Sequence, residues 1–247
     1  TVRPISKGSG AKEYVKYKLW ERASQVLDKI FHIAMVVDRQ SSASRLNVLS
    51  DPVSMLPENC KFEDELIRPA VKDILDSVRL NYSKYVLLYG SISTRKGIHQ
   101  LLKASESALW CENTAVVIAG KQSSEITGKL STLRSNVFSC DEFLTKYELL
   151  HLLRHSATVW AAYQPNFVGA SGVVLETIRE GKPFVYSNIG EIGTFCKRYN
   201  IGSEIGCLDS AADIVSAIAK LEVNGEEYSN ILLKHSAKHF CERLIYE

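Results

Sequence analysis

The sequence lacks the patterns that mark several common classes of protein. Its six cysteines are scattered without any C-x-x-C pair, which argues against a zinc site and against a dense disulfide framework. No apolar stretch approaches the roughly 20 residues of a membrane span, and no signal peptide is visible. The formal net charge of +2 is too small to indicate nucleic acid or an anionic membrane as a partner. We therefore expect a reducing, cytoplasmic environment, with peripheral membrane contact left open but not indicated.

Some nucleotide-binding and metal-binding motifs are also missing. The sequence contains no G-x-x-x-x-G-K-[ST] loop, and no G-x-G-x-x-G follows its early strands, which disfavours a nucleotide-dependent dehydrogenase. His151 and His155 stand four residues apart, as do His235 and His239. Neither pair has an evident third ligand or the glutamate of H-E-x-x-H, so we expect no metal site.

What the sequence does contain is a regular alternation of strands and helices. From residue 84 onward, continuous apolar runs are typical of strands buried on both faces, at 85–89, 115–119, 137–138, 158–161 and 184–186. Between and after them lie segments with helical spacing, at 98–109, 146–155, 171–180 and 211–221, and a terminal helix is predicted from Tyr228 to Leu244. The alternation predicts an α/β fold with a doubly wound parallel sheet.

The first part of the chain is organised differently. Short strands are predicted at 33–37 and 46–49, and the polar stretch 39–44 is the candidate linker. We expect residues 46–247 to form one Rossmann-like domain. Residues 1–45 are then the end of a preceding N-terminal domain or a linker segment. The chain begins without methionine, which suggests that it is part of a longer protein.

The sharpest local signal is the loop after the first long strand, YGSISTRKGI at 89–98. A phosphate group needs backbone and hydroxyl donors together with a fixed cation. Gly90 and Ser91 begin the turn, and Arg95 and Lys96 supply two adjacent cations. The alternative is an ordinary solvated basic turn between a strand and a helix.

A second signal is the crowding of small residues before a predicted helix, at Gly169, Ala170, Ser171 and Gly172. Backbone amides at such a helix start can approach an anion closely, and the helix dipole adds a favourable potential. Ser171 could face a phosphate or simply cap the helix. Glu176 could accept the two hydroxyls of a ribose, or it could be a solvated helix residue.

Three segments, VLLYGSISTRKGIHQLLKA, VVIAGK and VVLETIREGKPFVYSNIGEIG, give the sequence a family resemblance. In this order they resemble the C-terminal domain of group 1 retaining glycosyltransferases, which have the GT-B fold. The resemblance covers roughly residues 48–243. It implies a nucleotide-diphosphate-sugar as substrate, with no separate cofactor.

The resemblance also assigns roles to individual residues. Lys96 matches the lysine that holds the donor diphosphate, with Arg95 assisting. Glu176 matches the second glutamate of the family's E-x7-E pair, which binds the donor ribose. The remaining donor-binding candidates lie in the loops that meet the phosphates and the base: Gly90, Ser91, Gly120, Cys140, Asp141, Phe143, Gly169, Ala170, Ser171 and Gly172. Glu191 falls in the glycine-rich loop after the next strand.

The sequence departs from the family pattern at two positions. Val168 stands where the first glutamate of the pair is expected, and Ser91 stands where an arginine often follows the first glycine. Val168 removes the carboxylate that usually contacts the transferred sugar, so the identity of the sugar and the activity are both open. The donor base is open among uridine, guanosine and adenosine.

The family resemblance implies that the acceptor binds to an N-terminal domain, which is missing here. We therefore expect this chain to bind donor but to be inactive alone, and the acceptor is not identified. The implied chemistry is front-face attack, in which the leaving diphosphate takes the acceptor proton and the protein stabilises charge. Two alternatives are a non-catalytic sugar-nucleotide-binding or interaction module, and another GT-B-like enzyme such as an epimerase or phosphorylase.

Overall fold

The computed structural model describes residues 66–127, 130, 135–167 and 171–236, together with the backbone of two short strands before them. These strands are β1 (Ala34–Val36) and β2 (Val48–Ser50), and they pair in parallel, with Ala34 opposite Val48. Both lie where the sequence predicts strands. They form a sheet of their own, whereas the main sheet begins at residue 84. The boundary at residue 46 stays a prediction.

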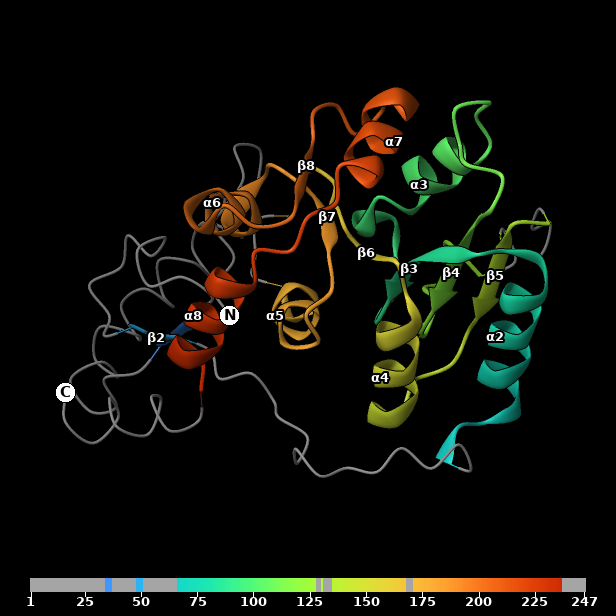
Figure 1. Cartoon of the computed structure of the whole chain (residues 1–247), viewed down its shortest axis with the longest axis horizontal. Helices are drawn as coiled ribbons and strands as arrows, with labels where there is room; N and C mark the ends of the chain where they lie inside the picture. Colours follow the sequence, from blue (N-terminus) through green and yellow to red (C-terminus); the bar gives the residue numbers. More distant parts are fainter. Residues whose placement is uncertain are drawn as a thin grey trace, which may run out of the picture.

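The main sheet has six parallel strands, which confirms the predicted fold class. They are β3 (Lys84–Tyr89), β4 (Thr114–Ala119), β5 (Val137–Cys140), β6 (Thr158–Ala161), β7 (Phe184–Ser187) and β8 (Ser203–Ile205). Their order across the sheet is β5-β4-β3-β6-β7-β8 (Figure 1). Strand β8 was not predicted, because this short edge strand contains Ser203 and Glu204 rather than an apolar run.

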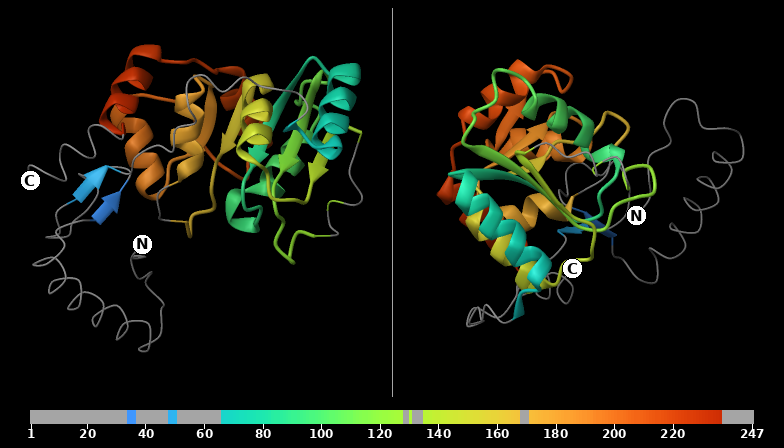
Figure 2. Two further views of the ribbon diagram at one scale, coloured as in Figure 1. Left: turned by 90° about the horizontal axis from the view of Figure 1, so that it is seen from below. Right: turned by 90° about the vertical axis from the view of Figure 1, so that its right-hand side faces the viewer.

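Helices cover both faces of the sheet (Figure 2). Helices α3 (Ile98–Ser105) and α7 (Ala211–Ala219) pack into one hydrophobic cluster. The other cluster receives α2 (Pro69–Asn81), α4 (Lys146–His155), α5 (Gly172–Arg179), α6 (Gly190–Tyr199) and α8 (Gly225–Lys234). In the right-hand view of Figure 2, α2 and α4 lie side by side along one face. The two layers of helices explain why the strands have continuous apolar runs.

Alternate side chains of the central strand β3 enter the two clusters. Tyr85, Leu87 and Tyr89 belong to the cluster with α2 and α4, whereas Val86 and Leu88 belong to the cluster with α3 and α7. All five are at most 3% exposed. Successive strand side chains point to opposite faces of a sheet, so both faces of β3 must be apolar. Tyr89, the last residue of the strand, is therefore fixed by the core directly below the loop that follows.

Helix boundaries differ from the predicted ones in one informative case. Helix α3 ends at Ser105, four residues before the expected Leu109. The hydroxyls of Ser105 and Ser107 donate to backbone carbonyls one turn back, a local competition that commonly accompanies helix ends. Leu109 is 58% exposed, and Trp110 lies in the core instead. Helix α8 ends at Lys234, and the residues expected to extend it beyond 236 lie outside the described part of the chain.

The strand order reverses direction between β3 and β6, since β4 follows β3 on one side and β6 lies on the other. Ligands of open parallel sheets bind beyond the carboxyl ends of the strands at such a reversal. At this edge the loops after β3 and β4 are joined: Gly90 donates to the carbonyl of Ala119, and Ile92 donates to that of Lys121 over 2.8 Å. The two loops therefore form one rim.

Gly120, directly after β4, is the residue that lets these loops meet. Its φ is +140°, and a Cβ there would lie 1.9 Å from the carbonyl oxygen of Gly90. We expect Gly120→Ala to lower the free energy of unfolding by at least about 2 kcal/mol, because the backbone of Gly90 must move. Urea denaturation followed by circular dichroism measures this change.

Gly172 supplies the matched control for this substitution. A Cβ added at this position meets no atom within 4 Å. We expect Gly172→Ala to leave the stability unchanged or to raise it by up to about 1 kcal/mol, because alanine favours the helix. Equal stabilities of the two variants would contradict the proposed crossing of the loops.

Candidate functional site

A cavity of about 460 Å³ opens at the carboxyl ends of β3 and β4 and at the start of α5. It lies at the edge where the strand order reverses. The residues predicted for the site that line it are Gly90, Ser91, Arg95, Lys96, Gly120, Phe143, Ser171, Gly172 and Glu176. The structure thus brings together residues that are separated by more than 80 positions in the chain.

Lys96 is the most constrained of these residues. It closes the short helix η2 (Thr94–Lys96), and the left-handed Gly97 (φ +60°) turns the chain into α3. Its side chain is only 5% exposed, and its ammonium donates to the carbonyl oxygen of Tyr89. The indole of Trp160 donates to the Lys96 carbonyl over 2.7 Å, which fixes the backbone as well. Lys96 is therefore not a solvated turn residue.

Burial has an electrostatic consequence for this lysine. Desolvation and, to a smaller extent, the positive charge of Arg95 lower the pKa of Lys96 to about 8, against the opposing effect of Glu176. The ammonium stays mostly charged at neutral pH, and among the described residues no carboxylate forms an ion pair with it. Arg95 itself is exposed, and its guanidinium lies 5.5 Å from the centre of the Phe167 ring. The basic loop thus contains one buried and one solvated cation.

Glu176 faces the cavity from the second turn of α5 and is half-buried. One carboxylate oxygen accepts a hydrogen bond of 3.0 Å from the phenol of Tyr89. Burial, together with the charge of Glu176, holds the pKa of Tyr89 well above its usual range, so the phenol remains a donor. Glu176 is therefore an oriented carboxylate rather than a freely solvated one.

Ser171 occupies the position before α5 but does not cap the helix through its side chain. Its hydroxyl instead shares a hydrogen bond of 2.7 Å with the phenol of Tyr163. The ring of Tyr163 stacks on Phe167, with centroids 4.1 Å apart. Gly172 and Val173, the first residues of the helix, line the cavity, so the positive end of the helix dipole faces it.

The predicted set of site residues lacks seven lining residues, among them the aromatic or charged Tyr89, Lys121, Tyr163 and Phe167. Each of these four stands at, or within six residues of, the carboxyl end of a strand, which is the signal that could have identified them. Lys121 adds a third cation to Arg95 and Lys96. Lys121 pairs with Asp141, and Glu176 is the one carboxylate among the described lining residues, so Arg95 and Lys96 leave the cavity with an excess of positive charge.

Other predicted residues do not line the cavity. Cys140 is buried at the end of β5, and burial raises the pKa of its thiol. Asp141 accepts a hydrogen bond of 2.7 Å from the backbone of Gln122 and pairs with Lys121, so it braces the rim. Glu191 lies in the first turn of α6. Gly169 and Ala170, like Val168, lie outside the described residues.

Comparison with known proteins adds evidence on the fold. No family model matches the sequence, and no curated protein matches it either. Solved structures do match. A UDP-forming α,α-trehalose-phosphate synthase from Burkholderia vietnamiensis has a TM-score of 0.62 at 11% identity, over 96% of this chain and 63% of that one.

Two further structures are glycosyltransferases by their descriptions. WaaG, involved in lipopolysaccharide biosynthesis, has a TM-score of 0.57 at 16% identity, over 92% of this chain and 64% of that one. AviGT4, involved in avilamycin A biosynthesis, has a TM-score of 0.57 at 18% identity, over 85% of this chain and 61% of that one. The chain has the fold of the GT-B glycosyltransferases. It spans less than two thirds of the length of each of these three structures.

The GT-B fold predicted from the three sequence motifs is thus confirmed. None of the helices in the part of the chain that the structure describes has the length and apolar composition to cross a bilayer. Within the same residues, no three His, Cys, Asp or Glu side chains gather as a metal site would require. The ring centroids of the His151–His155 pair lie 4.4 Å apart. Of the second pair, His239 lies outside the described residues.

The wall of the cavity that contains Phe143 is held in place by Arg68. This arginine precedes α2, and its guanidinium donates to Glu148 over 2.6 and 2.8 Å, to the carbonyl of Phe143 over 2.7 Å, and to Glu142. Glu148 is completely buried and also closes a capping box with Thr145 at the start of α4. We name this cluster of Arg68, Glu142, Glu148 and Thr145 the Arg68 latch. It fixes the loop between β5 and α4.

The latch makes a prediction about acid stability. Burial alone would raise the pKa of Glu148, but hydrogen bonds from Arg68 and from the backbone of Thr145 outweigh it and lower the pKa to about 2. A carboxyl whose pKa is lower in the folded state stabilises the fold above its ordinary pKa of about 4.5, and that stabilisation is lost as the pH falls toward 2. We expect Glu148→Gln to lower the free energy of unfolding by about 2–3 kcal/mol at pH 7, since Arg68 loses its buried charged partner.

Glu142→Gln serves as the control, because Glu142 contacts the same arginine but its side chain is 51% exposed. Exposed ion pairs contribute at most about 1 kcal/mol. Urea unfolding at pH 7, 5 and 3 should show a smaller acid-dependent loss of stability in Glu148→Gln than in the unaltered chain. An identical pH dependence in both would contradict the role assigned to the latch.

Proposed function

We propose that this chain binds a nucleotide-diphosphate-sugar in the cavity at the reversal of the strand order, as the donor-binding half of a retaining glycosyltransferase. The observation that carries the proposal is the pairing of two groups on one cavity. A buried cation, Lys96, and an oriented carboxylate, Glu176, face the same space from elements 80 residues apart. A diphosphate matches the cation, and a ribose diol matches the carboxylate.

The other lining groups fit the same ligand. Arg95 and Lys121 add positive charge, and the first residues of α5 present the positive end of the helix to a phosphate. Phe143 and Leu144, on the loop fixed by the Arg68 latch, offer apolar surface on another wall, and we assign this wall to the base. Uridine, guanosine and adenosine diphosphates are all candidates.

The proposed reaction needs no nucleophile from the protein. The bond between the anomeric carbon and the donor phosphate breaks as the acceptor oxygen attacks from the same face. The leaving diphosphate takes the acceptor proton and carries the charge that develops. Lys96, Arg95 and the helix start would stabilise that charge, which is the largest contribution that fixed groups make to catalysis.

Transfer also requires an acceptor held against the donor, since proximity supplies much of the rate. We assign the acceptor site to a further domain, as the coverage of the longer glycosyltransferases suggests. Val168 favours a second candidate function, a binding module that recognises the nucleotide but does not transfer the sugar. A transfer assay with a labelled donor and the whole protein distinguishes the two.

The test of donor binding is calorimetry of this chain with UDP, GDP and ADP. We expect one of them to bind, and Lys96→Met to weaken that binding about 10- to 150-fold, equivalent to about 1.5–3 kcal/mol for a charge-assisted hydrogen bond. The fold should persist and gain stability if it changes at all, because a buried ammonium is removed.

Lys103→Met is the matched control, since Lys103 is exposed in the last turn of α3 and does not line the cavity. Its affinity for the same diphosphate should equal that of the unaltered chain. If none of the three diphosphates binds, or if Lys96→Met binds as well as the unaltered chain, the proposed site is wrong.

The lowered pKa of Lys96 predicts how binding depends on pH. At about pH 7 the ammonium is mostly charged, and the affinity should be close to its highest value. Above about pH 8 the free lysine loses its proton, so binding must take one up, and the affinity should fall by up to about tenfold per pH unit. Calorimetry between pH 7 and 9 with whichever of UDP, GDP and ADP binds measures the effect, because the phosphates of the ligand are already ionised in this range. Lys96→Met should show no such decline.

A further inference from the structure

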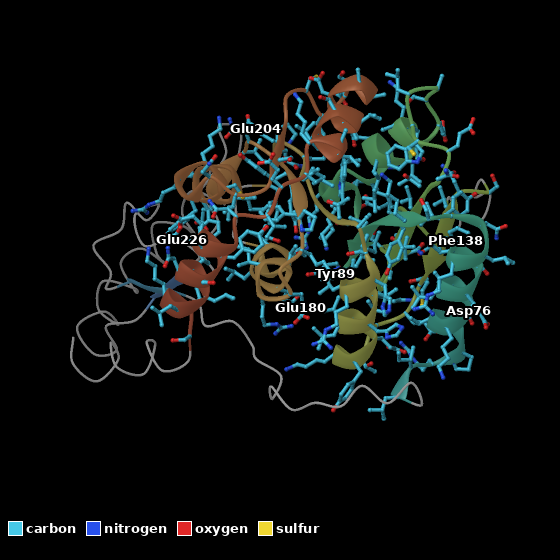
Figure 3. The ribbon with its side chains drawn as sticks, viewed as in Figure 1. Asp76, Tyr89, Phe138, Glu180, Glu204 and Glu226 are labelled. Carbon is cyan, nitrogen blue, oxygen red and sulfur yellow. The ribbon has the colours of Figure 1, made fainter. Side chains whose placement is uncertain are left out.

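Tyr89 contacts both of the groups on which the proposed function depends. Its backbone carbonyl accepts from the Lys96 ammonium, and its phenol donates to Glu176 over 3.0 Å. The two partners come from different elements, η2 and α5. Figure 3 labels Tyr89 beside α5, at the centre of the described part of the chain. One residue at the end of β3 therefore touches the cation and the carboxylate of the cavity.

The phenol has one proton and two acceptors within reach. The carbonyl of Val173 lies 3.2 Å away, and the carboxylate of Glu176 lies closer, at 3.0 Å. A hydrogen bond to an ionised acceptor is the stronger of the two kinds. The carboxylate is therefore the favoured acceptor. This bond uses one lone pair of one Glu176 oxygen and leaves the remaining lone pairs of the carboxylate for a ligand.

Tyr89 itself has little freedom to move. It is 2% exposed, and its ring packs in the cluster beneath the sheet. A rigid, buried donor restricts the rotamer of the side chain that accepts from it. A glutamate has three rotatable bonds, and fixing them before a ligand arrives removes part of the entropy cost of binding.

We propose that Tyr89 is a positioning residue that sets the Glu176 carboxylate to accept the two hydroxyls of a ribose, and that it thereby makes the site selective for ribonucleoside diphosphates. This inference rests on the proposed function and adds to it a source of selectivity. Tyr89 acts through Glu176 and need not touch the sugar itself.

The experiment compares three ligands in calorimetry: the tightest binder among UDP, GDP and ADP, its 2′,3′-dideoxy form, and inorganic pyrophosphate. We expect Tyr89→Phe to weaken the ribonucleoside diphosphate about 3- to 10-fold, the range for one hydrogen bond. The other two ligands should change by less than about 2-fold, because neither presents the diol. The carbonyl that holds Lys96 is retained in this variant.

Tyr85→Phe is the matched control. Tyr85 lies on the same strand and in the same cluster, and its buried phenol donates to the carbonyl of Leu152 over 2.6 Å, but it does not line the cavity. Removal of the Tyr85 hydroxyl should lower the free energy of unfolding without changing the affinity for any of the three ligands. In the double variant Tyr89→Phe with Glu176→Gln, the loss of affinity should not exceed that of Glu176→Gln alone, since Tyr89 acts through Glu176.

The outcomes separate this inference from the proposed function. Equal weakening of all three ligands by Tyr89→Phe, or additive losses in the double variant, would overturn the positioning role while donor binding stands. Unchanged binding of the ribonucleoside diphosphate by Tyr89→Phe would do the same. Absence of binding by UDP, GDP and ADP alike to the unaltered chain would overturn both.

Discussion

The ammonium of Lys96 lies at the carboxyl end of β3, where its side chain is nearly buried and no carboxylate of the described residues pairs with it directly. A buried cation is costly unless hydrogen bonds hold it, and here the carbonyl of Tyr89 provides one. The surrounding chain is arranged to keep that position. Gly97 turns the backbone through a left-handed conformation, and the indole of Trp160 holds the Lys96 carbonyl from β6. Both central strands at the reversal thus contribute to one charged group.

The remaining walls depend on contacts of a different kind. The loops after β3 and β4 meet through backbone hydrogen bonds, and only glycine fits at position 120. The loop after β5 is held by a guanidinium, that of Arg68, which reaches two carboxylates and a carbonyl. The close backbone contact between Gly90 and Gly120 leaves no room for a side chain at position 120. The ion pairs of Arg68 depend on pH instead. The rim at 90 and 120 is therefore set by steric fit, and the wall at Phe143 is set by charge.

The sequence predicted the parts of the fold where burial dictates composition. Strands β3 and β4 are covered on both faces, so their apolar runs were unmistakable, and the sheet type followed. Strand β8 pairs on one side only and contains polar residues, so it gave no such signal. The early end of α3 depends on hydroxyls of Ser105 and Ser107 that bond locally, which helical periodicity does not register.

The sequence predicted which residues lie at the candidate site better than it predicted their burial and their hydrogen-bond partners. Loop composition placed Lys96 and Glu176 at one edge, but an isolated basic turn is usually solvated, and only tertiary packing buries this one. Asp141 looked equally suited to a ligand, yet its carboxylate faces the backbone of Gln122. Tyr89 is the last residue of β3, and in the sequence its apolar neighbours indicate only a buried strand. Its phenol becomes relevant only when α5, more than 80 residues later, packs above it.

The balance of charge in the cavity bears on which part of a donor supplies the affinity. Arg95, Lys96 and Lys121 face it together with one carboxylate, Glu176, whose oxygen is already engaged. A diphosphate would compensate the positive charge that burial makes unfavourable. Its binding would therefore offset part of the desolvation cost of the Lys96 ammonium. A neutral sugar offers no such gain. Under the proposed function, the described residues therefore contribute affinity for the diphosphate rather than discrimination between sugars.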